Sequence, residues 1–421
     1  MILAAAVQFG FWADGFIRFV HEGYNLPRGP LGLLCYLPFV PIYWLLPQRR
    51  RSGYLWISSL VLAIVTLGPA YAAMMAALGL IAWAVVRGFG ARGRLAPGAL
   101  ILAAVYGSLV LYPQPPWLPP VTEPVYFYIH WAGIGYLFLR SYHVLADVAG
   151  GRLNLPGFHD FLAYLLFAPT LRMGPIYRYG EFARQTAEGP AVHRSLARAA
   201  GRFLTGCIRL AAMSVLVADD RIRTLYDAPE TLSALELVFY IQIPVLGLYL
   251  WISGYVDWSI AIGRLLGFAV PDNFNYPFRS ASIDEFWRRW HITLSMWLKD
   301  FIFIPLVRHR WHFFWSFTLT FLFCGAWHGK YPCYVLGGLL QGLALAGRRW
   351  WDHLWKNQRQ RSTPLYRGLE RLGLVRTPLN TALCWLTTYT FVMVSLSLGL
   401  DARHAFSRVA ARILSLLGLT F

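Results

Sequence analysis

Long apolar stretches follow one another along nearly the whole chain, with only short polar breaks between them. A helix needs about 20 apolar residues to cross a bilayer, so this feature predicts a membrane protein. Several stretches are short and are expected to be half-helices buried in protein. The pattern predicts an all-α polytopic membrane protein with about eleven transmembrane helices, plus re-entrant and interfacial helices. The stretches lie near residues 31–47, 53–68, 70–86, 95–112, 125–148, 157–171, 203–218, 232–250, 254–270, 311–327, 332–347, 380–399 and 405–421.

The share of charged residues excludes several other classes of protein. It is 14% of 421 residues, and 57% are hydrophobic, whereas soluble domains carry about 25% charged residues. A disordered chain, a disulfide scaffold and most soluble enzymes are therefore excluded. The net charge is +18, with cations in short runs such as 49–51 and 87–94. Such runs predict cytoplasmic loops, and too few polar stretches remain for a nucleic-acid partner to be expected.

The polar breaks suggest how the chain is organised. Half of the residues in 113–124 are proline, and this stretch has no Lys or Arg, so we expect a stiff loop facing outward. The basic stretch 349–379 is expected to be a cytoplasmic loop. We find no internal repeat of the kind that marks secondary transporters. The chain is interpreted as one membrane-embedded domain, 1–421, with its motifs in a core of about 160–345.

Charged residues gather unusually in residues 284–300, interleaved with tryptophan. Exposed to lipid, each charge would cost several kcal/mol, so the stretch belongs at the membrane interface or in a polar cavity. Helical spacing puts Trp287, His291 and Ser295 on one face, and Asp284 one turn before Arg288. The alternative without a functional role is that these tryptophans form an aromatic belt at the membrane interface.

A second signal is His328, which follows an apolar run within Gly325-Ala326-Trp327-His328-Gly329. Glycine lets a helix end or approach another closely, and an ionisable residue at membrane depth marks a functional site by default. The alternative is a hydrogen-bonded structural histidine. Asn273 has the same ambiguity, because Asn often only caps or turns the chain.

These residues resemble the membrane-bound O-acyltransferases, in the bacterial branch of alginate O-acetylases and teichoic-acid D-alanyl transfer proteins. The matching pieces are FLAYLLFAPTLRMGPIYRYGEF (161–182), SGYVDWSIAIGRLLGFAVPDNFNYPF (253–278), the 284–306 stretch, GAWHG (325–329) and GGLLQG (337–342). The resemblance implies a ring of spans around a central tunnel, with the motif histidine at its neck. It implies that His328 is essential for transfer and that His291 is the second recurrent histidine.

The implied reaction moves an acyl group from a thioester to a hydroxyl. We assign His328 as the base, because imidazole has a pKa near neutrality. Candidates for stabilising the oxyanion are His291, Arg288 and backbone N–H groups around Gly325. No bound cofactor and no metal are expected. The substrate-binding candidates are Asp284, Trp287, Arg288, Ser295, Trp327 and Asn273, and the donor-binding candidates are Arg308 and Arg310.

The expected donor is acyl-CoA or a phosphopantetheine carrier protein on the cytoplasmic side. The expected acceptor is an extracytoplasmic glycan, a lipid-linked acceptor or an acyl-relay protein, and the expected location is the bacterial cytoplasmic membrane, as a multi-pass protein in the lipid bilayer. Acetyl is the expected acyl group. D-alanyl transfer toward teichoic-acid-like polymers stays open, because KYPCYV is closer to the D-alanyl type and FWRRWH to the acetylase type. Alternatives of another class are a polysaccharide or lipid transporter and a membrane scaffold without catalysis.

Overall fold

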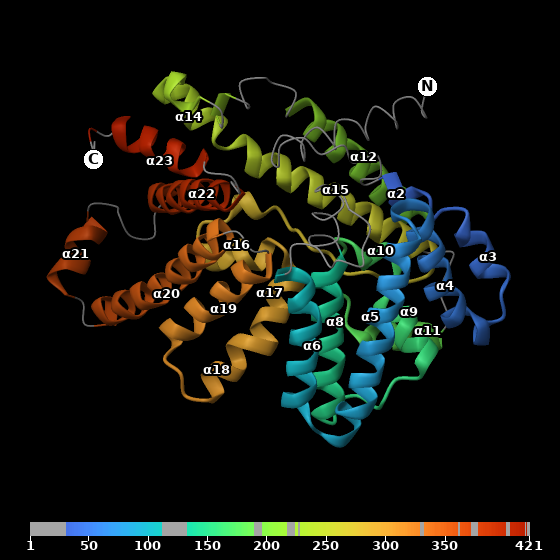
Figure 1. The fold of residues 1–421 in the computed structure, drawn as a ribbon. Helices are drawn as coiled ribbons and strands as arrows, with labels where there is room; N and C mark the ends of the chain where they lie inside the picture. The colour runs from blue at the N-terminus through green and yellow to red at the C-terminus, as the bar shows by residue number, and fades with distance from the viewer. Residues whose placement is uncertain are drawn as a thin grey trace. The chain divides into compact units, whose positions relative to one another are not determined.

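The structure is a computed structural model that describes residues 31–111, 133–188, 196–216, 224–225, 228–328, 332–360, 363–371, 378–400, 405–416 and 418. Every regular element in these ranges is a helix (Figure 1). The proline-rich stretch 113–124 and Gly329 of the GAWHG motif lie outside the described residues. The helical content agrees with the predicted all-α class.

The chain forms two compact units, Met1–Ala218 with Gly247–Asp272, and Asp219–Leu246 with Asn273–Phe421. Helices of the first unit are α2 (Leu31–Leu34), α3 (Phe39–Leu45), α4 (Gln48–Leu67), α5 (Pro69–Gly88), η1 (Gly90–Arg92), α6 (Leu95–Leu111), α8 (Gly135–Ala149), α9 (Phe158–Leu165), α10 (Ala168–Leu171), α11 (Tyr179–Glu188) and α12 (Leu196–Leu216). Helix α15 (Ile243–Leu265) begins in the second unit and continues in the first.

The other helices of the second unit are η4 (Pro229–Thr231), α14 (Ala234–Tyr240), η5 (Pro277–Arg279), α16 (Ile283–Arg289), α17 (Ile292–Leu298), the π-helix η6 (Lys299–Phe303), α18 (Ile304–Arg308), α19 (Phe313–His328), α20 (Pro332–Gln360), α21 (Pro364–Arg371), α22 (Pro378–Leu400) and α23 (Ala405–Leu416). In the first unit, α5 packs against α4, α6 and α8, and in the second, α20 packs against α16, α19 and α22 (Figure 1).

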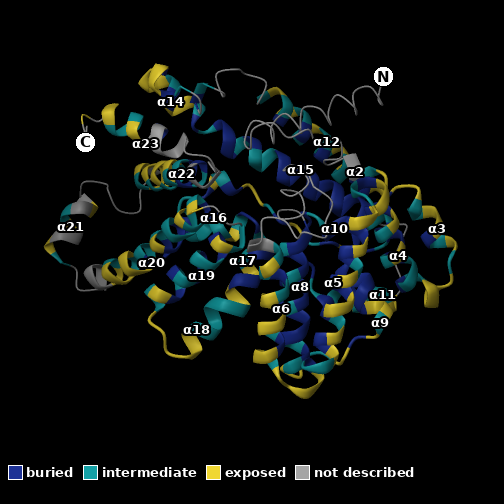
Figure 2. Cartoon of the chain, viewed as in Figure 1, coloured by how far each residue is buried: buried dark blue, intermediate teal, exposed yellow. Residues whose placement is uncertain are grey.

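Four helical stretches within the described ranges are long and apolar enough to cross a membrane. They are Pro69–Arg92, Leu196–Leu216, Ala234–Leu265 and Leu379–Ser397. Large apolar side chains on α12 point outward, among them Ile208 and Val215, with 69% and 77% of their surface exposed. Figure 2 shows such exposed positions beside buried ones on several helices. Outward apolar side chains suit a lipid environment; the span count of eleven stays a prediction.

The predicted division between residues 250 and 254 is wrong. Helix α15 runs without interruption through Gly254, and the chain breaks earlier, between α14 and α15. Gly254 serves packing: a Cβ atom there would lie 2.9 Å from Cγ of Leu210 on α12. A glycine that allows two helices to approach each other looks, in the sequence, like one that ends a helix.

The predicted loop at 349–379 is partly wrong as well. Helix α20 continues to Gln360, and α21 follows. Residues 349–360 contain neither Pro nor Gly and include several strong helix formers, so nothing in them stops the helix. The helix ends shortly before Pro364. The cytoplasmic side of this stretch stays a prediction.

One carboxylate is deeply buried in the first unit. Asp257 of α15 is 1% exposed and pairs with Arg202 and Arg209 of α12, at 2.8 and 2.6 Å. Arg202 also pairs with Asp272 at 2.5 Å. A buried charge is tolerated when it is paired in this way, so Asp257 joins two helices.

Candidate functional site

The helical hairpin of α19 and α20 fixes the position of His328, the last residue of α19. Three glycines let the two backbones touch. A Cβ atom at Gly325 would collide with the carbonyl of Tyr334, one at Gly338 with the carbonyl of Phe321, and one at Gly342 would lie 2.8 Å from Cα of Thr318. Larger residues would therefore separate the helices. The GAWHG and GGLLQG motifs thus meet in space along this contact.

His328 is half-buried among aromatic rings. The ring of Trp327 lies 4.8 Å from the imidazole, centroid to centroid, and the ring of Tyr334 lies 6.4 Å away. Cys324, one helical turn earlier, is 4% exposed. The imidazole is therefore at the C-terminal end of α19, in largely apolar surroundings.

His291 lies in a sharp turn between α16 and α17. Its φ and ψ are 44° and 52°, the left-handed region that non-glycine residues rarely adopt. The prediction that Trp287, His291 and Ser295 share one helical face is therefore wrong, because the helix breaks between them. Such a backbone conformation persists only where the surroundings hold it, and it is common at functional sites. The imidazole is 6% exposed.

Asn273 holds this turn. Its backbone carbonyl accepts a hydrogen bond from the Ile292 N–H at 2.9 Å. Its side-chain Oδ1 accepts from the Thr293 N–H at 3.0 Å and from the Thr293 hydroxyl at 2.8 Å. Because a backbone N–H can only donate, these bonds fix which end of the amide is oxygen.

The other end of the Asn273 amide is unusual. Asn273 is fully buried, and its Nδ2 finds no hydrogen-bond acceptor among the described residues. A buried donor without an acceptor costs about 1–3 kcal/mol. It therefore calls for an explanation, and a ligand oxygen is one.

The structure brings the two predicted histidines into one neighbourhood. His328 is close enough to His291 for the charge of one imidazole to act on the other. Asn273 is tied to His291 by its hydrogen bonds to Ile292 and Thr293, which hold the His291 turn. Two histidines and a buried amide donor can together move a proton and polarise a carbonyl group.

The other predicted site residues are exposed or have local partners. Arg288 is exposed, and Asp284 lies 3.9 Å from the Nε of Arg349. The Ser295 hydroxyl donates to the Trp290 carbonyl at 3.3 Å. A separate pair, Arg308 and Arg310, is exposed where α18 ends.

Sequence reasoning missed a buried polar chain in the second unit. Trp287 donates its indole N–H to Oε1 of Gln341 at 3.0 Å, and Nε2 of Gln341 donates to the Ser395 hydroxyl at 2.7 Å. Gln341 and Ser395 are each 2% exposed. The signal was a glutamine within the apolar GGLLQG motif, which needs a polar partner once buried.

A second polar chain is buried in the first unit and was also missed. The His143 imidazole contacts Asp147 at 3.2 Å through Nε2 and the Tyr164 hydroxyl at 3.2 Å through Nδ1. The Tyr164 hydroxyl donates to the Tyr177 carbonyl at 2.7 Å. The i, i+4 spacing of His143 and Asp147 was the available signal.

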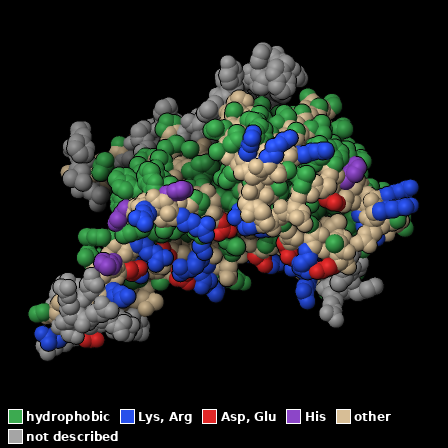
Figure 3. Space-filling model, turned by 90° about the horizontal axis from the view of Figure 1, so that it is seen from below, with side chains coloured by type: hydrophobic (Ala, Val, Ile, Leu, Met, Phe, Trp, Pro, Cys, Tyr) green, Lys and Arg blue, Asp and Glu red, His purple; other side chains and the backbone are tan. Residues whose placement is uncertain are grey.

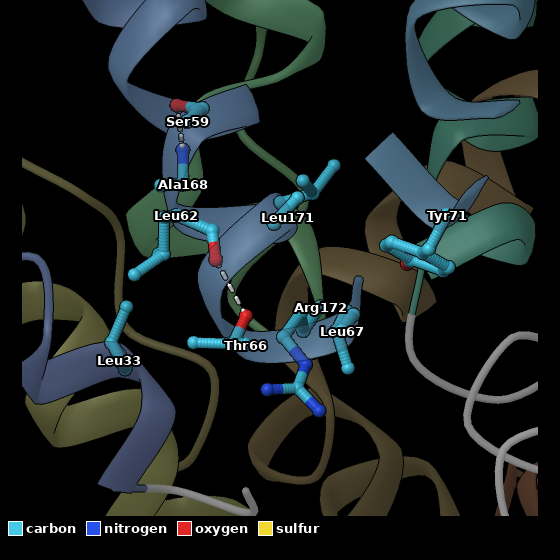
Figure 4. A pocket seen from close by; sticks show the side chains of 10 residues that line it. Leu33, Ser59, Leu62, Thr66, Leu67, Tyr71, Ala168, Leu171 and Arg172 are labelled. Carbon is cyan, nitrogen blue, oxygen red and sulfur yellow. Dashed lines mark hydrogen bonds between the residues drawn. The ribbon is translucent and has the colours of Figure 1, made fainter. Parts of the chain in front are cut away.

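The first unit also contains a small, mostly apolar pocket between α4, α5 and α10 (Figure 4). Tyr71 stands at one side of the residues drawn. Arg172 is the charged residue of a lining formed otherwise by neutral side chains. Among the residues that the structure describes, no three His, Cys, Asp or Glu side chains gather as metal ligands would.

Comparison with known proteins places this site in context. A family profile described as MBOAT, membrane-bound O-acyltransferase family, matches residues 128–378. The chain is 34% identical over 236 residues to the probable alginate O-acetylase of Pseudomonas aeruginosa, covering 52% of this chain and 42% of that protein. It is 32% identical over 209 residues to the peptidoglycan O-acetyltransferase of Helicobacter pylori, covering 48% of this chain and 39% of that protein. It is 26% identical over 379 residues to the teichoic acid D-alanyltransferase of Bacillus subtilis, covering 82% of this chain and 92% of that protein. The matches to the first two proteins therefore span less than half of their length.

Proposed function

Because the chain belongs to the membrane-bound O-acyltransferase family, we propose that it transfers an acyl group, acetyl in the first instance, from a thioester to a hydroxyl. The acceptor is an extracytoplasmic polysaccharide or another cell-envelope polymer, in line with the alginate and peptidoglycan relatives. The protein acts in the bacterial cytoplasmic membrane, which it crosses several times.

His328 is the general base of this proposal. It takes the proton of the acceptor hydroxyl, whose oxygen then attacks the thioester carbonyl carbon. The carbon–sulfur bond breaks, and the proton on His328 passes to the departing thiolate. Imidazole suits both transfers because it binds and releases a proton near neutral pH.

Asn273 and His291 stabilise the oxyanion that forms on the carbonyl. The buried Nδ2 of Asn273 is a preorganised donor with no acceptor among the described residues, which supports this role. Arg288 is too exposed for such a role, and Gly325 lies inside α19, where its N–H belongs to the helical hydrogen-bond ladder. Of the candidates considered from sequence, His291 is therefore preferred.

The donor is acyl-CoA or a phosphopantetheine carrier protein that arrives from the cytoplasm. Arg308 and Arg310 are exposed cations near the end of α18, and they attract the phosphates or acidic surface of such a donor. The acyl group passes from the cytoplasmic side through a tunnel in the protein. The two histidines lie at the narrowest part of this tunnel.

The observation that carries this proposal is the neighbourhood of His291 and His328 at two breaks in the helices. Proteoliposomes that hold radiolabelled acetyl-CoA inside and alginate outside would test the role of His328. His328→Gln should abolish the transfer of label, because glutamine keeps hydrogen bonding but does not act as a base. His312→Gln, at an exposed histidine just before α19, is the matched control and should behave as wild type. Retained transfer in the His328→Gln variant contradicts the base role.

D-alanyl transfer is the second candidate. It is favoured by the length of the match to the Bacillus subtilis D-alanyltransferase, which covers 92% of that protein. The same proteoliposomes, loaded with a D-alanyl carrier protein and supplied with teichoic acid, compare the two donors directly. Transfer of D-alanine without acetyl transfer would replace the first candidate.

A further inference from the structure

A cleft in the first unit lies between the first turns of α4 and α9 and one side of α11. Its volume is ≈ 460 Å³, within the range of about 300–1,000 Å³ that is usual for small-molecule sites. Phe158, Tyr179 and Phe182 form apolar and aromatic parts of its lining. Arg49, His159 and Asp160 add polar groups of three different kinds.

The two charged groups of the cleft are not neutralised by each other. Arg49 and Asp160 are both exposed, and no ion pair joins them in the part of the chain that the structure describes. A cation and an anion therefore face the same space, each open to a ligand. A ligand that carries both charges would complement them, whereas one with a single charge would be repelled by one of the two.

His159 adds a hydrogen-bond donor beside them. Trp56 donates its indole N–H to Nδ1 of His159 at 3.2 Å. A neutral imidazole that accepts at Nδ1 carries its proton on Nε2, which can then donate. Burial, together with the nearby Asp160 carboxylate, raises the pKa of Tyr179 to about 12, so its phenol also keeps its proton.

The surroundings of the cleft have the composition of a membrane–water interface. Phe158 packs against Trp56 and Trp83, with ring centroids 6.5 and 5.1 Å apart, and the Arg87 guanidinium lies 5.1 Å from the centre of the Trp83 ring. Trp and Arg concentrate at the level of lipid headgroups. Figure 3 shows Lys and Arg side chains standing among hydrophobic ones on the face that it presents.

From these observations we propose that the cleft binds the headgroup of a zwitterionic phospholipid of the phosphoethanolamine type. Arg49 and His159 hold the phosphate, and Asp160 holds the ammonium group. The aromatic lining packs against the glycerol and the first methylene groups. A trimethylammonium group has no N–H to donate to Asp160, and a glycerol headgroup has no cation to offer it, so both bind less well.

Native mass spectrometry of the purified full chain tests this proposal. The protein in detergent is given equal amounts of phosphatidylethanolamine, phosphatidylglycerol and phosphatidylcholine. We expect one phosphatidylethanolamine to be retained in preference to the others. Arg49→Gln should reduce its retention about tenfold, the loss of roughly one charged hydrogen bond. Arg50→Gln, at a neighbouring cation that does not line the cleft, should leave it unchanged.

Asp160→Asn is the more specific test of headgroup recognition, because it removes the negative charge but keeps the shape of the side chain. The preference should then move from phosphatidylethanolamine to phosphatidylglycerol. Equal retention of the three lipids by the wild type, or equal loss in the Arg49 and Arg50 variants, overturns the proposal. A further arm adds soluble glycerophosphoethanolamine at the same concentration as the lipid. If it displaces the lipid, the occupant is a free phosphoester and the lipid assignment is wrong; if the lipid stays, the assignment holds.

Discussion

Gln341 of α20 accepts the indole N–H of Trp287 on α16 at 3.0 Å, and this bond joins the helix before His291 to the helix after His328. The Gln341 amide is satisfied at its other end by Ser395 of α22, at 2.7 Å. Three helices of the second unit are therefore tied by one buried side chain. A polar link of this kind fixes helices in a way that interchangeable apolar contacts do not.

Replacing the central residue of this chain should loosen the second unit. Gln341→Leu leaves the Trp287 N–H without its acceptor, at a cost of about 1–3 kcal/mol, whereas the Ser395 hydroxyl still donates to the Phe391 carbonyl at 2.6 Å. The midpoint of thermal unfolding should fall. Ser395→Ala should lower it less, because the Gln341 bond to Trp287 remains. An equal fall in both variants would show that the Trp287 bond contributes little.

Asn273→Asp separates the two ends of the Asn273 amide. Aspartate keeps an oxygen for Thr293 but lacks the Nδ2 donor, so kcat should fall by about a hundredfold while KM changes little. Thr293→Val is the matched change, because it removes a bond to Oδ1 and leaves Nδ2 in place. It should cost about 1 kcal/mol of stability and spare kcat. A similar loss of kcat in both variants would make Asn273 a purely positioning residue.

Gly338→Ala probes the contact of α19 with α20. The added methyl group meets the Phe321 carbonyl, so the helices must separate, at a cost of about 1–3 kcal/mol. Gly347→Ala, on the same helix, is the control because nothing lies within 4 Å of its Cβ position. There alanine should stabilise the helix by up to about 1 kcal/mol. Thermal unfolding in detergent measures both, and destabilisation by Gly347→Ala alone would contradict this packing.

The exposed cations at the end of α18 should speed the capture of the donor. The double change Arg308→Gln with Arg310→Gln should weaken binding of an acidic carrier protein to inside-out vesicles, and more so at low salt. The pair Arg87→Gln with Arg92→Gln removes the same charge from another predicted cytoplasmic stretch and serves as the control. Binding that is equal in inside-out and right-side-out vesicles, or independent of salt, would remove the cytoplasmic donor.

Part of the site was predictable because short segments of the sequence indicate it. His328 could be placed at a helix end because a long apolar run meets a glycine-flanked histidine. The His291 turn was not predictable, because residues 284–298 have good helical spacing and no Pro or Gly.

The sequence by itself determined that this chain is all-helical and apolar enough for a membrane, and it pointed to His328 and His291. Those properties follow from composition and local spacing, which act over a few turns of helix. Only the tertiary structure decided that the chain turns sharply at His291, because Asn273, some twenty positions earlier, supplies the hydrogen bonds that hold the turn. It likewise joined Trp287, Gln341 and Ser395, each 54 residues from the next. Residues so distant in sequence come into contact only when helices pack. A pattern that repeats every few residues does not predict which of them will meet.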